Sequence, residues 1–237
     1  MSQARNPLPI TPSVNTVMLE PQLLMTVLRD LSTSLLQYFG RPVRLVVHGG
    51  VVMVLHPQLA CRKSTRDVDY IHRSFVTEWK RMGVFDADAR LQLCIAATAS
   101  KFGLGADWMN AAADAALPWA KNSKGEWYDP VWTDATSASN MQINTFFRSP
   151  GLILVGVSWG WAVALKLVRY AKSDPHDIAS ILRLGQRHRR VQWTRHVLEG
   201  WLKSVCGAMG YSSYPPGAMD ALRDRMQDAI ELSEHLC

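Results

Sequence analysis

Apolar residues recur at helical spacing between residues 21 and 38, where leucines and a valine return every three or four positions. The pattern stops at Gly40-Arg41-Pro42, which ends a helix. Residues 43–47 are a short run rich in β-branched side chains, which predicts a strand. Residues 67–71 predict a second strand, and we expect it to pair with the first.

The rest of the chain continues in the same way. Residues 51–55 predict a short helix, and 58–66 predict a polar, basic loop. Residues 107–119 predict a helix, either whole or after a turn, whereas 121–140 are rich in turn residues and carry no clear pattern. Further strands are expected at 141–147 and 152–157. Further helices are expected at 74–82, 86–101, 161–171, 176–184, 194–209 and 219–235.

This order of elements predicts an α+β fold with a small mixed sheet flanked by helices. We expect a flexible, proline-containing segment over residues 1–17, a domain over 18–184 and a helical C-terminal region over 185–237. The most apolar stretch, 151–165, is shorter than the ~20 residues that span a bilayer. The N-terminal residues lack the apolar run of a signal peptide. We therefore expect a soluble, intracellular, cytoplasmic protein without a membrane partner.

Composition supports a globular protein, with 48% hydrophobic and 19% charged residues in 237. The formal net charge of +6 favours polyanions such as nucleotides or nucleic acid. The four cysteines have neither a C-x-x-C spacing nor a histidine pair that would complete a zinc pattern, so we expect free thiols.

Two carboxylates stand out because they are separated by one residue on a predicted strand. Asp67 and Asp69 would point to the same face, where mutual repulsion favours a bound cation such as Mg²⁺. Gly49-Gly50 follows the preceding strand directly and would let backbone N–H groups approach a phosphate. The alternative is an ordinary surface strand with alternating aspartates.

These residues resemble the nucleotidyltransferase superfamily, and more narrowly the AbiEii-type and MenT-type toxins and related minimal nucleotidyltransferase-like proteins. The similarity spans residues 43–184. That group shows a Gly-Gly turn followed by an Arg-x-Thr-x-Asp-x-Asp strand. The matching segments here are Gly49-Gly50, Lys63-x-Thr65-x-Asp67-x-Asp69, Asp107-Trp108-Met109-Asn110, Ala164-Leu165-Lys166-Leu167 and Lys172-Ser173-Asp174-Pro175-His176-Asp177-Ile178.

The resemblance implies transfer of a nucleotidyl group from a nucleoside triphosphate (NTP) to a hydroxyl of RNA (tRNA included), protein or a small molecule. Asp67 and Asp69 would hold Mg²⁺ or Mn²⁺, and Lys166 would neutralise the triphosphate. The remaining nucleotide-binding residues would be Gly49, Gly50, Lys63, Ser64, Thr65 and Asp177.

The chain also departs from the group's pattern. Lysine stands at 63 in place of arginine, residues 57–61 lengthen the gap before the aspartates, and the strand expected at 141–147 has no third carboxylate. Asp134 lies nearby in the sequence. A non-catalytic protein that binds nucleotide or nucleic acid therefore stays open beside the enzyme, as does a plain scaffold.

Several residues keep more than one interpretation. Lys166 would be a phosphate ligand, a snorkelling lysine at a helix edge, or the buried ion-pair partner of the two carboxylates. Asp177 would be either its support or a first-turn helix carboxylate. His48 would either contact the nucleotide or be structural, and Ser64 and Thr65 would either contact phosphate or cap a turn. A basic cluster would hold RNA or be a solvated helix end: Arg183, Arg187, His188, Arg189, Arg190 and Arg195.

Overall fold

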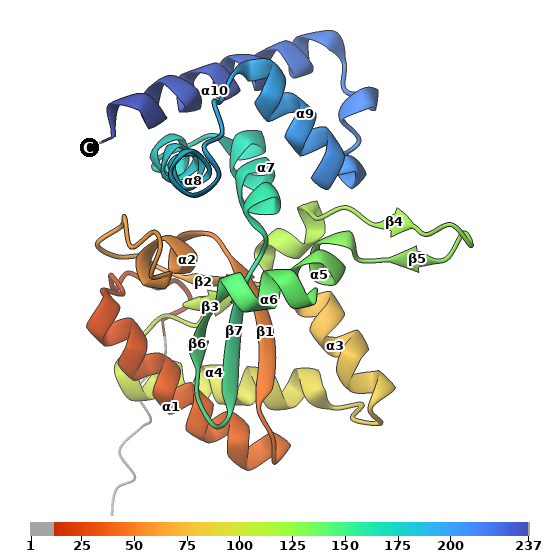
Figure 1. Cartoon of the computed structure of the whole chain (residues 1–237). Helices are drawn as coiled ribbons and strands as arrows, with labels where there is room; N and C mark the ends of the chain where they lie inside the picture. Colours follow the sequence, from red (N-terminus) through yellow and green to blue (C-terminus); the bar gives the residue numbers. More distant parts are fainter. Residues whose placement is uncertain (1–11, 237) are drawn as a thin grey trace, which may run out of the picture.

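A five-stranded mixed sheet lies at the centre of the computed structural model, which describes residues 12–236 (Figure 1). The strand order is β3-β2-β1-β7-β6, and β1 pairs with β7 in parallel and with β2 antiparallel. The α+β expectation is therefore confirmed at this level. The strands are β1 (Val43–His48), β2 (Val68–Tyr70), β3 (Met109–Asn110), β6 (Thr145–Arg148) and β7 (Leu152–Gly156).

Strands β1 and β7 form the buried middle of the sheet. Their register runs from Val43 opposite Leu152 to Val47 opposite Gly156. Both strands are almost continuously apolar, as expected for a parallel pair covered on both faces. Alternate residues of β1 enter different cores: Leu45 packs with the first cluster of buried residues and Val46 with the second.

Helices cover both faces of the sheet. The first core is built largely with α1 (Pro21–Phe39), α3 (His72–Arg81) and α4 (Ala87–Phe102). The second is built largely with the helices drawn uppermost in Figure 1, α7 (Trp159–Arg169), α8 (Asp174–Arg189), α9 (Arg195–Val205) and α10 (Pro216–His235). The remaining helices are α2 (Gly50–Leu55), α5 (Pro130–Ala135) and α6 (Ala138–Asn144).

The C-terminal helices belong to the same core as α7 and α8. Leu167, Leu182, Leu202 and Met226, one from each of α7 to α10, are fully buried together. Arg225 of α10 also donates hydrogen bonds to the last carbonyls of α7, at 2.8 and 2.7 Å. The boundary expected after residue 184 falls inside α8. In the structure, the group of helices that share this core begins with α7.

Two sequence predictions were wrong in part, and a third stretch holds elements that the sequence did not predict. Residues 107–119 hold β3 and a 3-10 helix, Ala112–Ala116, in place of an α-helix. The strand expected at 141–147 begins only at Thr145, because Ser137 caps α6 by accepting from the Asn140 N–H. Residues 121–140 contain α5, the start of α6 and most of a hairpin.

That hairpin, β4 (Ala120–Lys121) and β5 (Trp127–Tyr128), projects from the body of the molecule (Figure 1). Its ends are held by Arg73, which donates to the carbonyls of Leu117 and Pro118 at 2.9 and 2.8 Å. Asp129 also accepts from Arg73 and caps α5.

The end of the segment expected to be flexible is fixed in the structure. Residues 1–11 lie outside the described residues, but Asn15 is buried and its side chain bonds Gly105 and the carbonyls of Val17 and Arg66. The Asn15 backbone runs so close to Gly105 that a Cβ there would lie 2.1 Å from it. Among the described residues, no helix is long and apolar enough to cross a membrane.

Replacement of two leucines on α4, one buried and one exposed, tests which face of this helix packs against the first core. Leu91 is fully buried and Leu93 is 58% exposed. Replacing Leu91 by alanine should lower the free energy of unfolding by about 2–5 kcal/mol, because it leaves a cavity. Leu93→Ala on the same helix should change it by less than ~1 kcal/mol. Urea unfolding measures both, and equal losses would contradict the placement of α4.

Candidate functional site

The candidate site begins where β1 ends. Gly49 has φ +74° and ψ −145°, a conformation open essentially only to glycine, and it turns the chain directly into α2. His48, the last residue of β1, lies opposite Asp69 in the antiparallel β1–β2 ladder. Pairing across this ladder brings the glycine turn beside the aspartate strand.

Both glycines are required by a close approach of the following segment. A Cβ on Gly49 would lie 2.5 Å from Oδ2 of Asp69, and one on Gly50 would lie 2.2 Å from Oγ1 of Thr65. Either contact is too short for a real Cβ. The two glycines therefore let the turn lie directly against the segment that carries the aspartates.

A cleft of about 650 Å³ opens over this turn. Seven of the residues predicted from the sequence line it: Gly49, Gly50, Lys63, Ser64, Thr65, Asp67 and Asp69. The other lining residues are Met18, Arg62, Arg66, Arg169, Ala171, Lys172 and Ser173. The structure thus brings together two segments of the motif with the loop between α7 and α8.

The paired carboxylates repel each other. Burial, and after it the nearby charge of Asp67, raise the pKa of Asp69 to about 6 against the opposing charges of Arg169 and Lys166. Asp69 alternates along β2 with two buried residues, Val68 and Tyr70, so its side chain lies on the opposite face from theirs. An additional positive charge at this place would stabilise the ionised pair.

Lys166 lies in the wall behind the cleft and does not line it. It is 5% exposed, and its Nζ lies 2.5 Å from Oδ2 of Asp177 and 3.5 Å from Oδ1 of Asp174. The interpretation as a lysine at a solvated helix edge is therefore wrong. The charge of Lys166 still acts on Asp69 and lowers the pKa of that carboxyl.

Asp177 is also buried, in the first turn of α8, and it joins two cations. Besides Lys166, it accepts two hydrogen bonds from Arg62, one of them 2.7 Å long from Nε. Asp177 is therefore both a carboxylate in the first turn of a helix and the hydrogen-bond partner of Lys166.

Sequence reasoning missed Arg62 and Arg169. Nη1 of Arg62 would lie 3.3 Å from a Cβ on Gly50, so this guanidinium borders the glycine turn, whereas Lys63 is exposed. Arg169 lines the cleft and is held by Asp174 through two hydrogen bonds of 2.7 Å. Its position three residues after Lys166, on the same helix face, was a usable signal.

The loop between α7 and α8 has an unusual backbone. Tyr170 and Lys172 adopt left-handed conformations, with φ of +45° and +55°. Asp174 fixes this loop by accepting from the backbone N–H of Ala171 at 3.0 Å. The loop is thereby held in a shape that presents Lys172 and Ser173 to the cleft.

His48 and Thr65 are both buried beside the glycine turn. Burial and the charges of Lys166 and Arg169 lower the pKa of His48 to about 4, so its ring is neutral at neutral pH. Its Nε2 is buried without a hydrogen-bond partner among the described residues. Thr65 donates its hydroxyl to the Asp67 carbonyl at 3.1 Å, and its backbone pairs with Leu19.

The site offers two carboxylates to a cation. Within residues 12–236, no group of three or more histidine, cysteine or acidic side chains is gathered as a metal site. Asp134, the nearby acidic residue in the sequence, accepts from the Ser158 hydroxyl and does not line the cleft.

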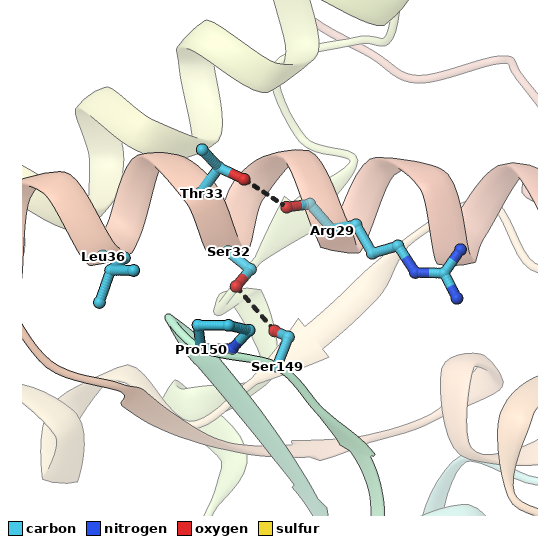
Figure 2. Close-up of a pocket in the computed structure, with 6 residues that line it drawn as sticks. All are labelled: Arg29, Ser32, Thr33, Leu36, Ser149 and Pro150. Carbon is cyan, nitrogen blue, oxygen red and sulfur yellow. Dashed lines mark hydrogen bonds between the residues drawn. The ribbon is translucent and has the colours of Figure 1, made fainter.

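A smaller cavity of about 240 Å³ lies elsewhere, between α1 and the turn that joins β6 to β7 (Figure 2). Its hydroxyls bond within the wall: Ser149 donates to Ser32 at 2.7 Å, and Thr33 donates to the Arg29 carbonyl at 3.1 Å. It lacks carboxylates and has one cationic side chain, Arg29. The larger cleft is therefore the candidate site.

Comparison with known proteins adds no family assignment: no family model, curated protein or solved structure matches this chain.

Replacing Asp69 by asparagine should stabilise the protein at pH 7.5 without divalent cations. The raised pKa of about 6 means that the folded state favours the protonated carboxyl, so ionisation costs stability as the pH rises from about 3.8 to 6. We expect a gain on the order of 2 kcal/mol at pH 7.5, smaller at pH 5 and absent below the ordinary pKa.

Urea unfolding at the two pH values measures this difference. Asp224→Asn, at an exposed carboxylate of α10, removes the same charge and should leave the free energy of unfolding nearly unchanged at both. A destabilised Asp69→Asn protein at pH 7.5 would contradict the raised pKa of Asp69.

Gly49→Ala should destabilise the protein more than Gly83→Ala. Gly83 also has a positive φ, +82°, but a Cβ there would meet no described atom within 4 Å. Gly83→Ala should cost about 1 kcal/mol through the left-handed backbone. Gly49→Ala should cost at least ~1 kcal/mol more, because its φ and ψ are open essentially only to glycine and its Cβ would meet Asp69. Equal losses in thermal or urea unfolding would contradict the backbone conformation and close packing of the Gly49 turn.

Proposed function

We propose that the chain has a nucleotidyltransferase-like fold and transfers a nucleotidyl group from an NTP to a hydroxyl in a metal-dependent reaction. One observation carries the proposal: a Gly-Gly turn lies against a pair of repelling carboxylates inside an open, basic cleft. A phosphate-binding turn and a cation-binding pair in one cleft match the needs of a metal-bound triphosphate.

The donor set fits a hard divalent cation. Mg²⁺ is commonly held by one or two carboxylates together with substrate phosphates and water, so two aspartates suffice for such a site. Asp67 and Asp69 would hold Mg²⁺ or Mn²⁺. When bound, the ion would neutralise charge on the triphosphate and activate the acceptor oxygen.

Charge in the cleft favours a polyanionic substrate. Five cationic side chains line it against two carboxylates: Arg62, Lys63, Arg66, Arg169 and Lys172. Arg62 and Arg169 are fixed by buried aspartates, so their guanidinium groups are already positioned before a ligand binds. Fixed cations of this kind stabilise charge that develops on phosphoryl oxygens without a cost of reorganisation.

Lys166 contributes from behind the cleft. Its ammonium is buried between Asp177 and Asp174 and close enough to Asp69 to lower the pKa of that carboxyl. We propose that Lys166 keeps the carboxylates ionised and adds positive potential beneath the triphosphate. The acceptor would be an RNA, a protein side chain or a small molecule that carries a hydroxyl.

A second candidate is a non-catalytic protein that binds nucleotide through the same cleft. It is favoured by the missing third carboxylate, since Asp134 is turned to Ser158 and the described residues gather no larger metal-ligating group. The two candidates share the binding step and differ in turnover.

Label transfer tests the proposal. The purified chain, Mg²⁺ or Mn²⁺ and each α-labelled NTP are incubated with total RNA, with protein extract and with small-molecule extract. Asp67→Asn/Asp69→Asn should lower transfer by at least ~100-fold, because it removes the charges that would hold the metal. Asp224→Asn/Glu234→Gln removes the same charge from exposed sites and should retain full activity.

Binding of an unlabelled NTP, measured by calorimetry with and without Mg²⁺, separates the candidates. Metal-dependent binding without transfer to any acceptor would favour the non-catalytic protein. Equal transfer by the wild type and the Asp67→Asn/Asp69→Asn variant would disprove the role of the two aspartates.

A further inference from the structure

The C-terminal half of α8 and the loop after it carry most of the net charge of the protein. Residues 178–198 contain five arginines and neither lysine nor an acidic residue, against a formal net charge of +6 for the whole chain. Four of these arginines are exposed: Arg187, Arg189, Arg190 and Arg195. We call these four side chains the arginine face.

No residue of the arginine face forms an ion pair within the part of the chain that the structure describes. Elsewhere, Arg62, Arg169 and Arg223 each hold a carboxylate. Arg183, on the same helix, also has a buried Nη1 without a hydrogen-bond partner among the described residues. The four side chains of the arginine face therefore have no carboxylate partner within 4 Å among the described residues.

Helix stability does not account for this placement. Arg187 and Arg189 in the last turn of α8 would favourably meet the negative end of the helix dipole. Arg195, however, is the first residue of α9, where the dipole disfavours a cation. Arg183 and Arg187 are four residues apart on one helix, where like charges destabilise.

The loop presents these side chains from a fixed backbone. Trp193 packs on Gly185, where a Cβ would lie 2.8 Å from its ring, and its Nε1 donates to the Leu182 carbonyl at 2.7 Å. The Trp193 and Trp201 rings are 5.3 Å apart, and Thr194 caps α9 by accepting from the Val197 N–H at 3.2 Å. The turn that carries Arg190 and Arg195 is thereby anchored at both ends.

We infer that the arginine face binds the phosphate backbone of RNA. Arginine, more than lysine, is suited to phosphate because its planar guanidinium donates in pairs and stacks on bases. The face is a helix end and a loop, not a long exposed helix that would enter the major groove of DNA. A-form RNA is contacted through phosphates and 2′-hydroxyls, which such a surface reaches.

The position of α8 connects this face to the cleft. The N-terminal end of α8 follows Lys172 and Ser173, which line the cleft, and the helix lies above α2 in the view of Figure 1. At ~1.5 Å per residue, its two ends are about 22 Å apart. An RNA bound by the arginine face would extend over that distance to reach the cleft.

This inference rests on the proposed function, because it selects RNA among the possible acceptors. A small-molecule acceptor would need no binding surface so far from the cleft. RNA binding itself requires neither NTP nor turnover, so the two claims can fail separately.

Fluorescence anisotropy with a short fluorescein-labelled RNA hairpin tests the inference at several salt concentrations. Arg187→Ala/Arg189→Ala/Arg190→Ala should raise the Kd at least ~10-fold near 0.1 M salt and lower the slope of log Kd against log salt by about three. Arg29→Ala/Arg81→Ala/Arg148→Ala removes the same charge from three other exposed arginines and should leave both values near wild type.

Hydrogen exchange gives a second readout that needs no variant. RNA should slow exchange of the amides in residues 187–196 of the wild-type chain more than elsewhere in α9 and α10. The wild-type chain should bind the hairpin without NTP or divalent cation, so RNA binding is measurable even if label transfer fails.

Three results would overturn the inference. One is an equal loss of RNA affinity in the two triple variants, which would show that only the net charge of the protein matters for binding. Another is equally tight binding of a DNA hairpin of the same sequence, which would remove the assignment to RNA. The third is the absence of RNA binding by the wild-type chain at low salt.

Discussion

The buried carboxylate of Asp177 is the interaction on which the geometry of the cleft depends. It holds Lys166 of α7 and Arg62 of the loop before β2, so one side chain joins the helical layer to the segment that carries the aspartates. Removing one member of a buried ion pair commonly costs about 3–5 kcal/mol, because the remaining charge stays buried without compensation. Arg62, which faces the cleft, is thus fixed by a carboxylate that does not line it, and Asp174 does the same for Arg169.

Much of the fold was predictable, because its main elements have strong local signals. The helical spacing of leucines in α1 and the β-branched run in β1 gave their bounds to within one residue. The errors came where local signals are weak. β3 has only two residues, and its strand geometry comes from pairing with β2. Residues 138–144 became helical because Ser137 caps them and Asn140 is buried, donating to the carbonyls of Ala135 and Gly156.

The sequence predicted most residues of the candidate site, but it did not predict which of them line the cleft and which lie behind it. Spacing placed Asp67 and Asp69 beside the glycine turn, which the structure shows through the contact of Gly49 with Asp69. Sequence could not tell that Lys166 is covered by Asp177, because that depends on the crossing of α7 and α8. It also assigned the arginine position to Lys63, whereas the guanidinium against the turn belongs to its neighbour Arg62; a shift of one residue in a loop leaves no periodic signal.

The hydrogen bonds of Arg225 to the end of α7 have a consequence for synthesis of the chain. The sheet, the glycine turn and both aspartates of the cleft lie within residues 43–156, whereas the helix that carries Lys166 and Arg169 is capped by a side chain of α10. Chains grow from the N-terminus at ~5–20 residues per second, and their parts fold as they emerge. A nascent chain would therefore form the glycine turn, both aspartates and three of the five cleft cations first. The wall that carries Arg169 and Lys172 would be fixed only after residue 225 has left the ribosome.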